Sequence, residues 1–74
     1  MEKQIAETAK QIWAMISEDV VPDGKSISRE DVIAIVADQF EFNAPREIAI
    51  YFSRLTHERQ ATILKEAFPR GFSY

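Results

Sequence analysis

The chain has 74 residues, of which 46% are hydrophobic and 28% charged, with two glycines, no cysteine and a formal net charge of −3. This length allows one domain with a small core, and the composition excludes a disordered or collagen-like chain. The lack of cysteine excludes disulfides, thiolate catalysis and thiolate metal clusters, so hydrophobic packing must supply the stability, alone or shared with a second copy.

The charge is unevenly distributed along the chain. Residues 1–42 carry nine acids and four bases, a balance of −5, whereas residues 43–74 carry five bases and three acids, a balance of +2. Such an asymmetry can steer a charged partner or favour head-to-tail association, although a split of this size is also ordinary in small domains.

The N-terminal segment does not have the pattern of a targeting sequence. Acidic residues occur early in it and no uninterrupted apolar run follows, which excludes a signal peptide. No segment approaches the roughly 20 consecutive apolar residues of a membrane span. We therefore expect a cytoplasmic protein that has no membrane partner.

The first predicted element is a helix over residues 3–18. Apolar residues recur there at spacings of three and four, which places them on one stripe: Ile5, Ala9, Ile12, Trp13, Ile16 and Val20. Pro22 and Gly24 then interrupt helical continuation, so residues 19–27 are expected to form a turn or a short extended segment.

A second helix is predicted over residues 28–40. The Ser28 hydroxyl can cap its first turn, where Glu30 and Asp31 complement the positive end of the helix dipole. An alternative comes from the β-branched residues of 32–36 and the alternating apolar residues of 48–52, which are also typical of strands. The polar residues that flank both segments favour helices.

The second half predicts two further helices, over 45–55 and 57–68. Asn43 is expected to cap the first of them and Thr56 the second, while Pro69 ends the pattern. The connection between them is so short that the chain must turn a sharp corner. Residues 69–74 form a tail without helical pattern, so we expect a single all-α domain over 1–74, with four short helices around one core.

The segment from Asp19 to Asp31, DVVPDGKSISRED, resembles an EF-hand calcium loop with one extra residue. Such a loop needs oxygen ligands at positions 1, 3, 5 and 12 and a glycine at position 6. With Gly24 at position 6, acids occupy three of the ligand positions, but Val21 stands at position 3. If the register is shifted by one residue, the aliphatic Ile27 falls at position 8, where such a loop needs one. Lys25 then replaces the glycine at position 6. We favour a polar connector and keep a degenerate calcium loop as a minor alternative.

No catalytic constellation can be assembled from this sequence. His57 is the only histidine, and no nucleophile or carboxylate is tied to it by a recognisable spacing. It is expected to face solvent in the first turn of the last helix. We therefore expect no enzyme activity and no cofactor or metal.

A helix-turn-helix-like domain that binds nucleic acid is the main alternative function. The last helix would contact the duplex through four polar side chains: Arg59, Gln60, Thr62 and Lys65. An acidic domain is poorly suited to this role, because attraction to phosphate dominates nucleic-acid affinity.

The eight aromatic residues indicate a different function. Trp13, Phe40, Phe52 and Phe68 occupy core positions of the predicted helices, whereas Phe42 lies in an expected turn and two more lie in the tail. The turn and tail aromatics either cover the core or anchor a partner, and aromatic and arginine residues dominate interface hot spots. We expect a protein-interaction or regulatory module, able to form a homodimer, that binds through Phe42, Arg54, Arg59, Phe72 and Tyr74.

Overall fold

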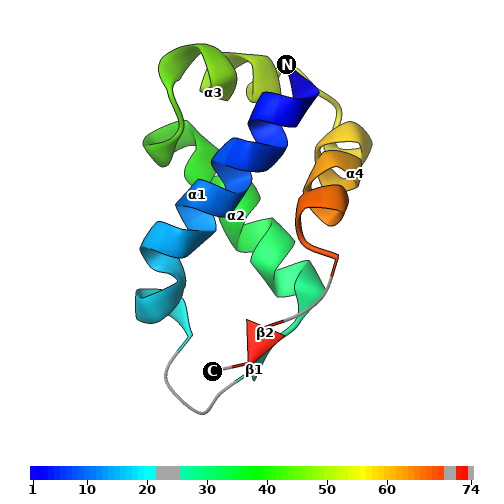
Figure 1. Ribbon diagram of the computed structural model, residues 1–74. Helices are drawn as coiled ribbons and strands as arrows, with labels where there is room; N and C mark the ends of the chain where they lie inside the picture. The colour runs from blue at the N-terminus through cyan, green and yellow to red at the C-terminus, as the bar shows by residue number, and fades with distance from the viewer. Residues whose placement is uncertain (22–25, 70–71, 74) are drawn as a thin grey trace.

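The computed structural model describes residues 1–21, 26–69 and 72–73, which form four α-helices and one pair of two-residue strands (Figure 1). In chain order they are α1 (Glu2–Val20), β1 (Ser26–Ile27), α2 (Arg29–Asn43), α3 (Arg46–Ser53), α4 (His57–Ala67) and β2 (Phe72–Ser73). The predicted all-α class with four helices around one core is confirmed.

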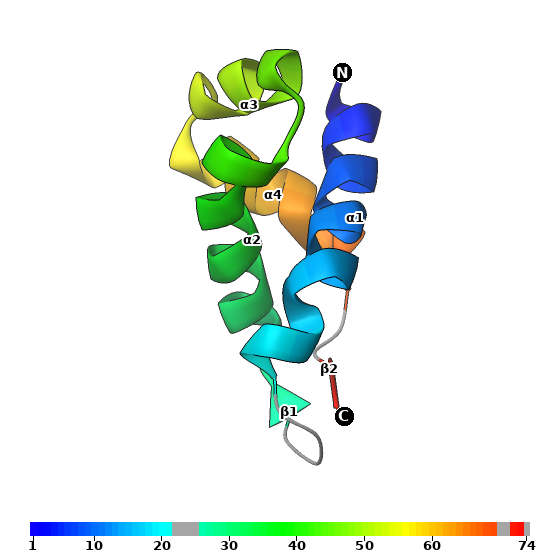
Figure 2. The ribbon, with the colours of Figure 1, turned by 90° about the vertical axis from the view of Figure 1, so that its left-hand side faces the viewer.

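The helices α1 and α2 lie side by side and run in opposite directions, and α4 packs against both (Figures 1 and 2). The short helix α3 lies at the end of the molecule where α2 finishes and α1 begins. The strands β1 and β2 lie at the opposite end (Figure 2). The two ends therefore have different architecture, helical at one and a small antiparallel strand pair at the other.

The core is built from every helix. Its buried members include the four aromatic residues predicted for it, Trp13, Phe40, Phe52 and Phe68. The rings of Phe40 and Phe52 are stacked with centroids 4.2 Å apart, and Trp13 meets Phe68 edge to face at 6.4 Å. The core prediction for these residues is confirmed.

The first helix is longer than predicted. The α1 helix continues through Val20, and the amide of Val21 still donates to the carbonyl oxygen of Ser17 at 2.9 Å. Val21, rather than Val20, is buried in the core. Val21 has an extended backbone, as expected for a residue that precedes proline, so the helix ends there and not at residue 18.

The second helix confirms the helical interpretation and rules out the strand alternative. The Ser28 hydroxyl accepts a hydrogen bond from the amide of Asp31 at 3.1 Å, which is the predicted cap. The β-branched residues of 32–36 are helical because α2 lies at the centre of the fold, in contact with all three other helices. Burial on several sides outweighs their weak strand preference.

The junction between α2 and α3 corrects two predictions. Asn43 belongs to the last turn of α2, where its side-chain amide donates to Gln39, and it does not cap α3. Phe42 consequently lies on a helix and not in a turn. Ala44 is extended because Pro45 follows it, which ends α2 at residue 43 and makes Pro45 the N-cap of α3.

The corner between α3 and α4 takes only residues 54–56. The Thr56 hydroxyl accepts from the amide of Arg59 at 3.1 Å, so this predicted cap is confirmed. The Gln60 side chain donates back to the carbonyl oxygens of Phe52 at 2.7 Å and Leu55 at 3.4 Å. The carbonyl oxygen of Phe52 also accepts from the amide of Leu55 at 3.1 Å, so the Gln60 side chain adds a link from α4 to the last turn of α3 and to the corner.

Two hydrogen bonds that were not predicted from the sequence connect the start of α2 to the end of α4. The guanidinium of Arg29 donates from Nε to the carbonyl oxygen of Phe68 at 2.9 Å and from Nη2 to that of Lys65 at 3.0 Å. Just beyond, residues 26–27 pair with 72–73 in antiparallel register. Part of the predicted tail is thus a strand that closes this end of the molecule.

Candidate interaction surface

A groove of about 770 Å³ lies between the C-terminal half of α2 and the helix α3, which we call the α2–α3 groove. Its lining combines apolar, small and charged side chains: Ala37, Asp38, Phe40, Glu41, Ala44, Arg46, Ala49, Ile50, Phe52, Ser53 and Gln60. The proline-directed bend at residues 44–45 separates the two helices and so creates the space between them.

The apolar part of the lining comes from aromatic, alanine and isoleucine side chains. The stacked rings of Phe40 and Phe52 are among the lining residues but are almost completely buried, and the alanines beside them are too small to fill the space. Ile50 stands on the α3 wall with 40% of its surface exposed. Polar and apolar atoms contribute about equally to the lining, so the groove offers apolar contacts together with polar groups, as ligand and peptide sites do.

The edge of the groove carries unpaired charge. Asp38 and Glu41 lie on the α2 wall and Arg46 at the start of α3, and all three side chains are exposed. Within residues 1–21, 26–69 and 72–73, none of the three has a hydrogen-bond or ion-pair partner. These groups are therefore free to meet charges on a bound molecule.

The five predicted contact residues do not form one surface. Phe42 is the most exposed large apolar residue of the described chain, at 73%, but it does not line the groove. Arg54 is exposed directly after α3. Phe72 belongs to β2 at the opposite end of the molecule (Figure 1), and Tyr74 lies outside the described residues.

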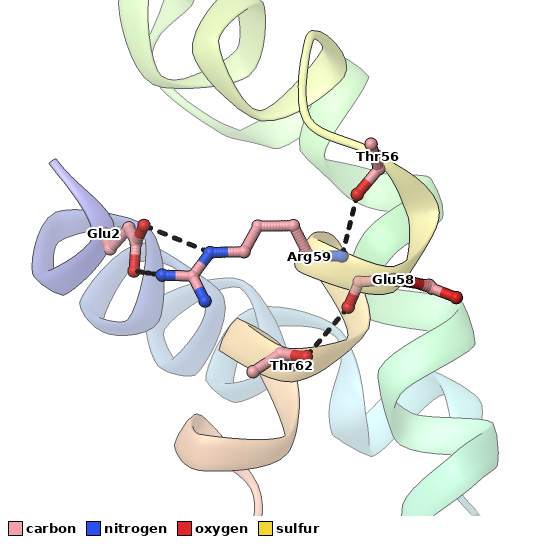
Figure 3. A network of polar contacts seen from close by, with 5 residues as sticks. All are labelled: Glu2, Thr56, Glu58, Arg59 and Thr62. Carbon is pink, nitrogen blue, oxygen red and sulfur yellow. Dashed lines mark hydrogen bonds and ion pairs between the residues drawn. The ribbon is translucent and has the colours of Figure 1, made fainter.

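The fifth, Arg59, is engaged within the chain. Its guanidinium forms a two-pronged ion pair with Glu2, with Nε donating to Oε2 at 3.2 Å, and this links α4 to the first turn of α1 (Figure 3). The hydrogen bond from Arg59 lowers the pKa of Glu2, and the same bond raises the pKa of Arg59. A partner that used Arg59 would have to compete with Glu2.

The side chains of α4 suit the nucleic-acid alternative poorly. The Thr62 hydroxyl donates to the carbonyl oxygen of Glu58 at 2.9 Å and Arg59 is held by Glu2 (Figure 3). The Gln60 side chain donates to the carbonyl oxygen of Phe52 in the last turn of α3. Of the four side chains proposed to contact a duplex, only Lys65 keeps its polar group outside such bonds in the described structure. A duplex that bound to α4 would therefore have to displace hydrogen bonds that these side chains already make within the chain.

The segment resembling a calcium loop lies partly outside the described residues, because 22–25 are not among them. Among the positions of this segment that the structure describes, Asp19 belongs to α1, Val21 is buried in the core and Ser28 caps α2. His57 is exposed in the first turn of α4, as predicted. Among the described residues, no group of three or more histidine, aspartate or glutamate side chains could hold a metal ion.

Comparisons with family models, curated proteins and solved structures find no match to this chain. None of the helices in the described part of the chain is long and apolar enough to cross a membrane.

The α2–α3 groove was not predicted from the sequence. Its residues carried no motif, and the alanines that open it were indistinguishable from core alanines. The nearest signal was Pro45 and the short connection around residues 43–46, which placed two helices in close succession without fixing the angle between them. That angle depends on packing against α1 and α4.

Proposed function

We propose that this chain is a non-catalytic module that binds another protein through the α2–α3 groove. The observation that carries the proposal is an open groove between two helices, lined by alanines and by the exposed Ile50, with charged side chains beside them. Such a groove accepts the apolar face of a partner helix, which is a common mode of peptide recognition.

The exposed side chains of α3 extend the same surface. Tyr51 is 38% exposed, and Arg46 and Arg54 stand at the two ends of the helix. Tyrosine and arginine are enriched among residues that dominate binding energy. The predicted use of aromatic and arginine residues from the C-terminal half is therefore proposed for α3, with a second copy of the chain as the alternative partner.

Site-specific photo-crosslinking tests this function. A photoreactive benzoylphenylalanine placed at Ile50 should give discrete adducts of higher mass in the cells that produce the protein. The same group at Met15, which is exposed on α1 and outside the groove, is the matched control and should give none. An adduct of twice the chain mass would identify a second copy as partner. Equal adducts at both positions, or none at Ile50, would contradict the proposal.

A further inference from the structure

We infer that the occupant of the α2–α3 groove is an amphipathic helix whose apolar face is flanked by lysine or arginine on the side that meets α2. This inference rests on the proposed function and specifies the chemistry of the partner. It follows from the backbone of the groove, from its charges and from the surfaces that this chain itself presents.

The backbone of the groove favours a helix over an extended peptide. Both walls are α-helices, whose backbone amides and carbonyls are already paired within each helix. The only strands among the described residues lie at the other end of the molecule (Figure 2). A partner strand would find no edge to extend here, so recognition must use side chains, as it does when a helix lies in a groove.

The charges of α2 specify basic residues on the partner. Asp38 and Glu41 stand on the groove wall, and Asp31 lies on the same exposed face about two turns before Asp38. The only basic residue of α2, Arg29, is bonded to carbonyl oxygens at the end of α4. The α2 side of the groove is therefore uniformly acidic, whereas Arg46 lies on the α3 side.

A second copy of this chain matches the groove less well. The exposed apolar residues of α1, Met15 and Val20, lie beside the acids Glu18 and Asp19, which would face the acidic wall of α2. Arg59, on α4, is already paired with Glu2. The α3 helix of a second copy does carry the exposed Ile50 between Arg46 and Arg54. It is only eight residues long and already forms one wall of its own groove, so a separate basic segment is the better complement.

Two designed peptides of about 18 residues, long enough to form a helix, test the inference. Both carry the same leucine and alanine face, but one has lysine and the other glutamate at the flanking positions. Fluorescence anisotropy measures their affinities for the full chain, and ¹⁵N chemical shifts locate the binding. The lysine peptide should bind about tenfold more tightly, weaken as salt is added and shift amides of residues 37–44 and 46–53.

Charge-neutral variants locate the cause of the preference. The double substitution Asp38→Asn with Glu41→Gln should reduce the preference for the lysine peptide to about twofold or less. Glu18→Gln with Asp19→Asn, on α1 and outside the groove, is the matched control and should leave the preference unchanged. Thermal melting of each variant checks that it is folded.

The outcomes separate this inference from the function it rests on. Equal binding of both peptides in the groove, or tighter binding of the glutamate peptide, would overturn the basic partner and leave the proposed function standing. Failure of both peptides to shift residues 37–53 would overturn the inference as well. The proposed function itself is decided separately, by the crosslinking from Ile50 and its Met15 control.

Discussion

The two flanks of α2 differ in how far neighbouring helices cover them. One flank carries Val32, Val36 and Phe40, all fully buried against the rest of the core. The other carries Ala37, Glu41 and Ala44, which face a groove because α3 is only eight residues long and leaves that flank partly open. The comparison teaches that one helix can supply core residues on one flank and the wall of an open groove on the other.

The largest expected effect comes from the packed side of this comparison. Leu64→Ala removes a fully buried side chain of α4 and should lower the free energy of unfolding by about 2–5 kcal/mol. Ile50→Ala in the groove should cost less than about 1 kcal/mol, because much of that side chain is already in water. Urea unfolding measures both. Equal losses would mean that the groove is part of the core.

The next effect concerns the end of the molecule opposite α3. Arg29→Met keeps most of the apolar stem but removes two hydrogen bonds to carbonyl oxygens, and should cost about 1.5–3 kcal/mol. Arg54→Met, at an exposed position after α3, is the control and should stay within about 0.5 kcal/mol. Equal stability of the two variants would mean that Arg29 does not form these two hydrogen bonds in solution.

Helix caps should have smaller and local effects. Ser28→Ala and Thr56→Ala each remove a side-chain acceptor from a first-turn amide and should cost about 1 kcal/mol. Asn43→Ala should cost clearly less, since Asn43 bonds within α2 and caps nothing in the structure. Chemical denaturation of the three variants compares them. A loss at Asn43 as large as at Ser28 would support the cap predicted from the sequence.

The smallest effect is expected at the ion pair between α1 and α4. The pKa of Glu2 is lowered from 4.5 by its hydrogen bond to Arg59, so its contribution to stability is present above about pH 4.5 and is lost as the pH falls through the lowered value. Glu2→Gln should therefore be slightly less stable than the parent at pH 7 and equal to it at low pH. Arg59→Gln and the double variant complete the cycle. Parallel stability curves across this pH range would contradict the pairing.

The elements that could be predicted are those set by local chemistry. Ser28 and Thr56 have side chains that cap a helix wherever they precede one, and the spacing of Ile5, Ala9 and Ile12 defines one face in any packed helix. Each of these signals depends on residues close in sequence. The four helices and their aromatic core follow from them.

The features that could not be predicted depend on residues far apart in the chain. Arg29 meets the carbonyl oxygens of residues 36 and 39 positions away, and β1 pairs with a strand near the other end of the chain. Asn43 is a local failure of a different kind, because an amide side chain before a proline can cap the next helix or finish the previous one. Pro45 decided the outcome by forcing Ala44 to be extended.

The α2–α3 groove is also one of the features that could not be predicted from the sequence. Its lining brings together residues of α2, α3 and α4, and Gln60 of α4 bonds to the carbonyl oxygens of Phe52 and Leu55 at the end of α3. No pattern within α2 or α3 alone contains that information. The candidate site therefore had to come from the structure, whereas the general function was suggested by the aromatic and arginine content.

Hydrogen exchange measured by mass spectrometry tests the central claim most directly, using the chain alone and the complex captured by crosslinking at Ile50. If the α2–α3 groove is the binding surface, exchange should slow in residues 37–44 and 46–53, while the exposed face of α1 keeps its rate. Slowing confined to α1 or to the first turn of α4, with residues 37–53 unchanged, would contradict the account.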